Sequence, residues 1–260
     1  MTLIVGIRCS DGVVLGSDSA ATNVTSTGER TSMQPTDKLD IISDKIIIGV
    51  SGQVGLAQLF KSEIEKLWND KGLAGAEISD ARLKLSEVLR KHLYIEFQAV
   101  KQAPGPLQNL FTQGVLSQTL IALPIKKQPI LLEFTAMGSS EEKNERLPTV
   151  AIGCAQQIVD PFLACLRRIF WKDRLPTLAE GKLAASWALD YSIQAAPGGV
   201  GPPIKLVTLE KNGENWQTHQ LSEAELNEQS EAVDGIEDYI RDFKLSKGEP
   251  EKPPEPKSAP

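Results

Sequence analysis

Four residues near the start of the chain have types and spacing suited to hydrolysing an amide bond: Thr2, Asp18, Lys38 and Gly52. Once Met1 is removed, Thr2 carries a hydroxyl and a free α-amine on one residue. That amine has an unperturbed pKa of about 8, so it can act as general base for the hydroxyl. A lysine held beside it lowers the pKa of both groups, and a carboxylate keeps that lysine charged and oriented. A glycine N–H in an open turn can stabilise an oxyanion.

Two β-hairpins are expected to position these residues. The runs TLIVGIRC and VVLGSDS flank Ser10-Asp11-Gly12, and Asp-Gly between apolar runs is a strong local hairpin signal. Folding the chain there returns Asp18 toward the N-terminus. The run KLDIISDKIIIGVSGQ turns at Ser43-Asp44-Lys45, which is expected to set Lys38 opposite Gly52. If the hairpins are neighbours in one sheet, the candidate residues share one end of it.

The rest of the chain predicts an α+β fold. Ile46-Ile47-Ile48 is apolar on both pleat faces, so the sheet should be covered on both sides. The segment from Thr22 to Thr36 is polar and is expected to be a loop. Runs of strands alternating with helix pairs favour an antiparallel sandwich faced by helices. The expected later elements are helices at about 56–68 and 85–100, strands at about 114–122, 129–135 and 148–152, helices at about 155–171 and 177–195, and a strand at 203–210.

Composition argues against several classes of protein. Residues 222–260 carry eleven acidic and five basic side chains, so the whole net charge of −6 lies there and the body has no bulk charge for nucleic acid. No apolar run approaches the roughly 18 residues of a membrane span. Three cysteines without a CxxC pair and two histidines argue against a zinc site and against disulfides. A cytoplasmic location and the absence of any metal or organic cofactor are therefore expected.

The motifs around the four residues resemble a known family. TLIVGIRCSDGVVLGSDSAAT is similar to the opening of mature proteasome β-type subunits, which are N-terminal nucleophile (Ntn) hydrolases. KLDIISDKIIIGVSG resembles the lysine motif of that family, including the fourteen-residue step from Lys38 to Gly52. Residues 151–153 and 195–199 resemble later family landmarks, so the resemblance covers about residues 2–210. Within the superfamily the chain is most similar to the β-proteobacterial proteasome homologue and next to HslV.

This resemblance implies a four-layer αββα sandwich and a threonine endopeptidase that hydrolyses peptide bonds. The implied catalytic residues are Thr2 as nucleophile, Asp18 and Lys38 as its support, and Gly52 as the oxyanion donor. Ala21, Thr22 and Val50 fall at substrate-binding positions. The mid-sized Val50 favours apolar side chains at P1, the substrate residue whose carbonyl is attacked.

The resemblance also implies partners. The chain is expected to form a homo-oligomer of two stacked rings, with seven subunits per ring preferred over six, around a chamber that admits peptides or unfolded proteins. An ATP-driven unfoldase is a candidate partner that the sequence does not name. No nucleic acid and no membrane are expected to bind.

Three positions depart from the family pattern. Cys154 stands where the family has a serine, and Gln194 and Pro197 replace a further aspartate and serine. Cys154 is expected to be a small, semi-buried side chain that donates or accepts only weakly. Pro197 lacks both a hydroxyl and a backbone N–H. Since these groups would position the amine and its water, slow turnover is expected.

Two other functions stay open. The chain could be a catalytically weak or inactive structural ring protein, or an Ntn amidohydrolase that acts on a small amide. For each of these three functions the expected organisation is the same. It consists of an Ntn domain over residues 1–221, an acidic helical extension over 222–243, and a disordered tail rich in Pro, Glu and Lys over 244–260.

Overall fold

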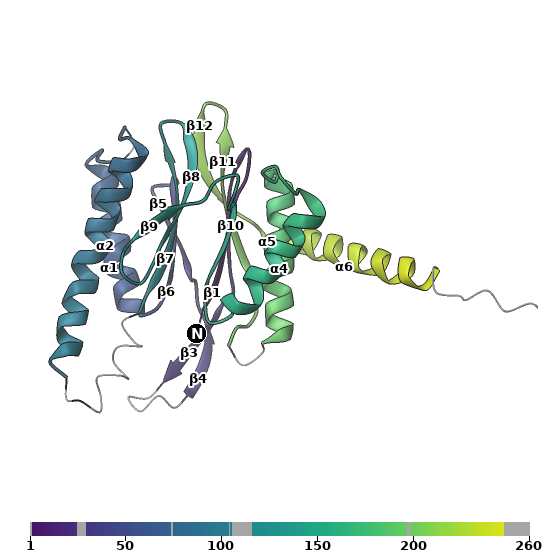
Figure 1. Ribbon diagram of the computed structural model, residues 1–260, viewed down its shortest axis with the longest axis horizontal. Coiled ribbons are helices and arrows are strands. Elements are labelled where there is room, and N and C mark those ends of the chain that lie inside the picture. The colour runs from purple at the N-terminus through teal and green to yellow at the C-terminus, as the bar shows by residue number, and fades with distance from the viewer. Residues whose placement is uncertain are drawn as a thin grey trace, which may run out of the picture.

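The computed structural model describes residues 2–24, 30–73, 75–103, 105, 116–196 and 199–246. Within that part of the chain, two five-stranded antiparallel sheets lie face to face (Figure 1). The first has the order β10-β1-β2-β11-β12, made of β10 (Thr149–Gly153), β1 (Leu3–Arg8), β2 (Gly12–Ser17), β11 (Lys205–Asn212) and β12 (Asn215–Gln220). The second has the order β5-β6-β7-β8-β9, made of β5 (Leu39–Ile42), β6 (Ile46–Ser51), β7 (Gln118–Ile125), β8 (Gln128–Phe134) and β9 (Ser140–Glu142).

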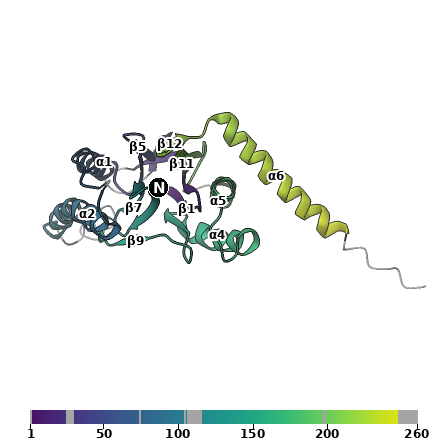
Figure 2. The same cartoon turned by 90° about the horizontal axis from the view of Figure 1, so that it is seen from above.

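Helices cover the outer face of each sheet. Helices α1 (Val54–Asn69) and α2 (Ile78–Lys101) pack on the second sheet, and α4 (Gln156–Phe170) and α5 (Leu178–Ala195) pack on the first. Seen from above, the layers are helix, sheet, sheet and helix (Figure 2). The α+β class and the αββα sandwich expected from the sequence are confirmed.

Strands apolar on both faces explain this layering. In β1, Leu3, Val5 and Ile7 point to the layer that α4 and α5 cover, while Ile4 points between the sheets. Alternate residues of a strand face opposite sides of its sheet, so a strand that is apolar at every position needs partners on both sides. Residues 46–48 of β6 follow the same rule, as predicted.

The first hairpin folds as expected. Strand β2 pairs with β1 in the register Ile4↔Ser17, and the turn closes with the amide of Cys9 donating to the Gly12 carbonyl at 2.9 Å. The backbone amide of Asp18 then donates to the Leu3 carbonyl at 3.2 Å, which places Asp18 beside the start of β1.

The second hairpin has a different register from the one expected. Leu39 pairs with Gly49, so the ladder sets position 38 across from Val50 and not from Gly52. The reason is the turn, in which Ser43 and Asp44 both have a φ of 51°, so that it closes one residue earlier than expected. The two hairpins also lie in different sheets, so the condition that they are neighbours in one sheet is not met.

The polar segment expected to be a loop contains two strands. Strands β3 (Ala20–Val24) and β4 (Arg30–Pro35) pair antiparallel and extend from the sandwich beside the N-terminus (Figure 1). The segment has no apolar alternation, because the hairpin projects beyond the layered core. The stretch around Trp216 and His219, expected to be strand-like, forms β12 and pairs with residues 207–212 of β11.

The last described helix, α6 (Glu223–Ser246), leaves the sandwich next to α5 and projects from it (Figure 2). Leu226, Val233 and Ile236 pack against the core beside α5, and the indole N–H of Trp187 donates to the Glu237 carboxylate at 2.9 Å. Residues 247–260 lie outside the described residues, and the division of the chain at 221 and 243 stays a prediction. None of the helices in the described part has the length and apolarity to cross a bilayer.

Candidate active site

Asp18 is a fully buried carboxylate held by four donors at the end of β2. Its Oδ1 accepts from the Leu3 amide at 2.8 Å and from Lys38 Nζ at 2.5 Å. Its Oδ2 accepts from the amides of Ala20 and Gly201, both at 3.1 Å. Because Leu3 directly follows Thr2, this carboxylate fixes the backbone at the candidate nucleophile.

Lys38 brings a positive charge to the same place from the second sheet. It directly precedes β5, its side chain is 6% exposed, and its Nζ also donates to the Ala20 carbonyl at 2.8 Å. Burial lowers the pKa of this ammonium below its ordinary value of 10.5, and the hydrogen bond and charge of Asp18 oppose that effect. The pair therefore bridges the two sheets.

Thr2 is held by its backbone carbonyl as well. The Cys154 amide donates to that carbonyl at 2.9 Å, just after β10 ends. Gly153 has a φ of +105°, and a Cβ there would lie 1.9 Å from the Thr2 carbonyl oxygen. Only glycine allows β10 to approach so closely, so Thr2 is fixed from both neighbouring strands.

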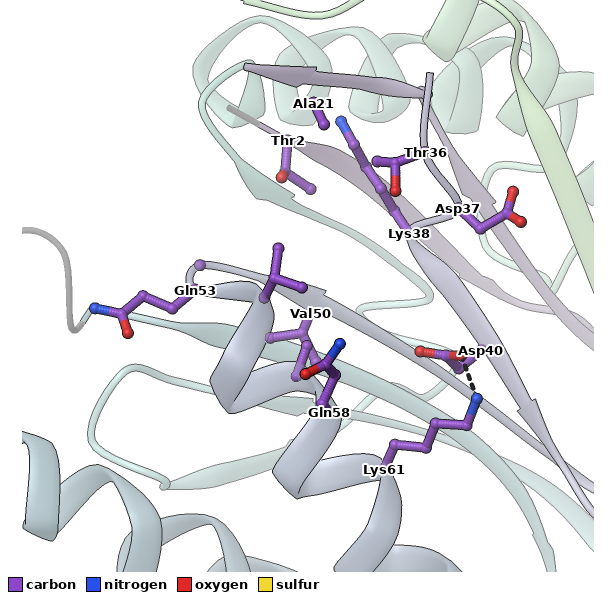
Figure 3. Close-up of a pocket in the computed structure, with 13 residues that line it drawn as sticks. Thr2, Ala21, Thr36, Asp37, Lys38, Asp40, Val50, Gln53, Gln58 and Lys61 are labelled. Atoms are coloured by element: carbon purple, nitrogen blue, oxygen red, sulfur yellow. Dashed lines mark hydrogen bonds and ion pairs between the residues drawn. The ribbon is translucent and has the colours of Figure 1, made fainter. Parts of the chain in front are cut away.

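A pocket of about 400 Å³ opens beside Thr2. The predicted residues that line it are Thr2, Ala21, Lys38, Val50 and Gly52. Figure 3 shows Thr2 and the Lys38 side chain at one end of this pocket, with Val50 between them and the far end. Asp18 is not among the residues that line the pocket, and the side chain of Thr22 lies outside the described part of the structure. Five of the predicted residues thus share one cavity.

Gly52 occupies the turn between β6 and α1. Its φ is +150°, and a Cβ there would lie 2.1 Å from the hydroxyl oxygen of Ser117, so the position requires glycine. Helix α1 begins two residues later at Val54, which also lines the pocket, and its N-cap Gln53 makes no side-chain cap hydrogen bond. The positive end of the helix dipole therefore faces the pocket, which suits a developing negative charge.

The two accessory residues lie apart from the pocket lining. Cys154 is exposed, so the expectation of a semi-buried side chain was wrong, and its thiol contacts the Gly199 carbonyl oxygen at 3.5 Å. The Gln194 amide donates to Asp190 of the same helix at 2.6 Å. Pro197 lies outside the described residues.

Sequence reasoning missed the far end of the pocket and the three backbone amides that donate to Asp18, those of Leu3, Ala20 and Gly201. Asp40 and Lys61 line that end and form an ion pair at 2.5 Å, shown as a dashed line in Figure 3. Asp40 follows Lys38 by two residues and so lies on the same strand face, a signal that was available. No local pattern pointed to Lys61 on α1, or to Gly201, which is 183 residues from Asp18.

A four-layer sandwich with a pocket at the first strand of the chain defines the N-terminal nucleophile hydrolase fold. The chain belongs to the proteasome subunit family, because residues 2–168 match the family model described as "Proteasome subunit".

Solved structures of Anbu proteins share this fold. Anbu (ancestral beta-subunit) from Yersinia bercovieri has 15% identity and a TM-score of 0.67, covering 96% of this chain and 100% of its own. Anbu from Hyphomicrobium sp. strain MC1 has 17% identity and a TM-score of 0.67, with the same two coverages of 96% and 100%. A structure titled "Helical Assembly of the Anbu Complex from Pseudomonas aeruginosa" has 15% identity and a TM-score of 0.64, covering 97% and 98%. Among curated proteins no match to this chain was found.

Proposed function

We propose that the protein is an N-terminal threonine endopeptidase that hydrolyses peptide bonds with slow turnover. The observation that carries the proposal is the buried Asp18–Lys38 ion pair, which anchors the residue after Thr2 in a pocket that Gly52 also lines. Lys38 holds its charge near the candidate nucleophile while Asp18 keeps both in place. This is the arrangement that a hydroxyl nucleophile needs when no histidine is at hand.

The reaction uses groups of this chain alone. With Met1 removed, the α-amine of Thr2 takes the hydroxyl proton as the oxygen attacks the substrate carbonyl. The Gly52 N–H and the start of α1 stabilise the resulting oxyanion. The amine then gives its proton to the departing amine of the substrate, which leaves an ester on Thr2. A water deprotonated by the α-amine hydrolyses this ester and frees the hydroxyl.

Slow turnover follows from the accessory positions. The weakly hydrogen-bonding thiol of Cys154 stands in for a hydroxyl, and the Gln194 amide is engaged by Asp190. Fewer fixed polar groups are therefore available to position the water that hydrolyses the ester on Thr2. A rate with a standard peptide amide that equals that of a complete proteasome site would contradict this part of the proposal.

The quaternary structure belongs to the proposal too. We infer a homo-oligomer of two stacked rings in the cytoplasm, with seven subunits per ring, that takes in peptides or proteins unfolded by an ATP-driven partner. Membership of the proteasome subunit family and the assembly named for the Pseudomonas aeruginosa Anbu support an oligomer. Native mass spectrometry reads the subunit number, and fewer than twelve would favour a small-amide hydrolase.

Intact mass spectrometry with a threonine-directed epoxyketone or boronate tests the chemistry. We expect a mass without Met1 and one adduct per chain, located on Thr2. Thr2→Ala should lose the adduct, whereas Thr36→Ala, a change at another threonine of the same pocket, should keep it. No adduct on the Met1-free chain would contradict the peptidase function. That result would favour a structural ring protein. The hydrogen bond from Gln194 to Asp190 supports this alternative, because it engages the amide at an accessory position.

A further inference from the structure

The charges in the pocket beside Thr2 are already paired. Four charged residues line it, and each forms an ion pair with another described residue. The pairs are Asp37 with Lys205, Lys38 with Asp18, and Asp40 with Lys61. The pocket is therefore rich in polar groups and electrically balanced.

A charged substrate side chain has no open counterion in this pocket. The P1 side chain must enter it, because the pocket contains both Thr2 and Gly52. A cationic P1 beside Asp40 would also lie beside the Lys61 ammonium, and an anionic P1 beside Lys61 would also lie beside the Asp40 carboxylate. A charged side chain would therefore meet a like charge as well as an opposite one, and it would gain little net attraction from this half-exposed ion pair.

An apolar P1 side chain would find apolar contacts along only part of the pocket wall. Val50, Val54 and Ala57 form apolar wall, but the far end carries Asp40 and Lys61. These two side chains are 44% and 40% exposed, so water still reaches them. An apolar group pressed against them would remove that water and supply no hydrogen bond in return.

We propose, on the basis of the peptidase function above, that the pocket selects a P1 side chain ending in a neutral carboxamide, as in glutamine. A carboxamide has both a donor and an acceptor. Its NH₂ can donate to the Asp40 carboxylate while its oxygen accepts from the Lys61 ammonium, and the ion pair stays intact. The aliphatic stem of glutamine lies against the apolar wall. The preference thus differs from the apolar one that Val50 alone suggests.

Four fluorogenic peptides that differ only at P1, as Gln, Leu, Glu or Lys, test the proposal. We expect kcat/KM for the Gln peptide to exceed the other three by about fivefold, which is what one net hydrogen bond supplies. The full-length protein without Met1 is used, and Thr2→Ala gives the background rate for each peptide.

Two substitutions should redirect the preference in opposite directions. Lys61→Met leaves the Asp40 carboxylate without its counterion, so the Lys peptide should gain relative to Gln. Asp40→Asn leaves the Lys61 ammonium, so the Glu peptide should gain. Lys66→Met is the matched control, because Lys66 lies on the same helix in an ion pair with Glu63 at 2.8 Å outside the pocket lining. Its P1 profile should equal that of the wild type.

The outcomes separate the two proposals. Thr2-dependent cleavage that is fastest with the Leu peptide, or P1 profiles that Lys61→Met and Asp40→Asn leave unchanged, would overturn the carboxamide preference alone. If no peptide is cleaved in a Thr2-dependent way and no probe labels Thr2, the peptidase function fails as well, and the selectivity fails with it.

Discussion

Replacing Asp18 by asparagine should destabilise the protein strongly, although the two side chains have nearly the same shape. The carboxylate accepts four hydrogen bonds in a fully buried position. Asparagine keeps one oxygen and turns the other into a donor. Either Lys38 and the Leu3 amide, or the two amides of Ala20 and Gly201, must then face a donor.

The magnitude follows from the burial of the pair. Lys38 is 6% exposed, so the change leaves an ammonium in the interior without its Asp18 counterion. Breaking a buried ion pair at one partner costs about 3–5 kcal/mol. Lys38→Met should cost less, about 2 kcal/mol, because Asp18 keeps its three amide donors. The double variant should be more stable than the two single costs predict by about 2 kcal/mol.

Urea unfolding followed by tryptophan fluorescence measures these free energies. All variants are compared at one protein concentration, since assembly adds to apparent stability. Asp40→Asn is the matched control, because its ion pair with Lys61 is 44% and 40% exposed and should be worth less than about 1 kcal/mol. The reasoning is refuted if Asp18→Asn lies within 1 kcal/mol of the wild type, or if the single costs simply add in the double variant.

Two further predictions concern the backbone at Thr2 and the cap of α5. Gly153→Ala should cost about 2–4 kcal/mol in urea unfolding and weaken probe labelling, because its Cβ would meet the Thr2 carbonyl oxygen. Gly213→Ala, which also has a positive φ but open space around it, should cost only about 1 kcal/mol, and equal costs would contradict the contact. A hydrogen bond from Arg174 is the main cause that holds the pKa of the Glu180 carboxyl at about 2, and the capping-box hydrogen bonds with Thr177 add to it, so this stabilisation is present above pH 4.5 and lost as pH falls toward 2. Because the Glu180 side chain is 30% exposed, we expect less than about 1 kcal/mol, and the wild type should lose its advantage over Glu180→Gln between pH 5 and pH 2; a difference that stays constant with pH would argue against it.

Local sequence patterns predicted much of the fold. The Asp11-Gly12 turn and the apolar residues 46–48 each depend on neighbours in the chain, so the first hairpin and the covered sheets were predictable. The turn of the second hairpin lies one residue earlier than expected, which moves the residue opposite Lys38 by two, because Ser43 and Asp44 both adopt left-handed conformations that non-glycine residues seldom take. The placement of Asp18 beside the start of the chain was predictable for the same local reason as the first turn.

The remaining parts of the site depend on contacts between distant segments. The meeting of Asp40 with Lys61 depends on how α1 lies across β5, which no periodicity encodes. The amide of Gly201 donates to Asp18 from a segment 183 residues further along the chain. The strands β3 and β4 escaped notice because a hairpin outside the core needs no apolar alternation.

The ion pair that joins the two sheets has a consequence for how the sandwich assembles. Asp18 and Lys38 are brought together by separate hairpins that lie in different sheets. If the sheets stacked with one hairpin displaced, the two charges would be buried apart, at a cost of several kcal/mol. Apolar faces tolerate many alignments, whereas this pair tolerates one. The ion pair therefore favours one stacking of the two sheets over all others. A misaligned chain is destabilised at the same place where the backbone around Thr2 is held.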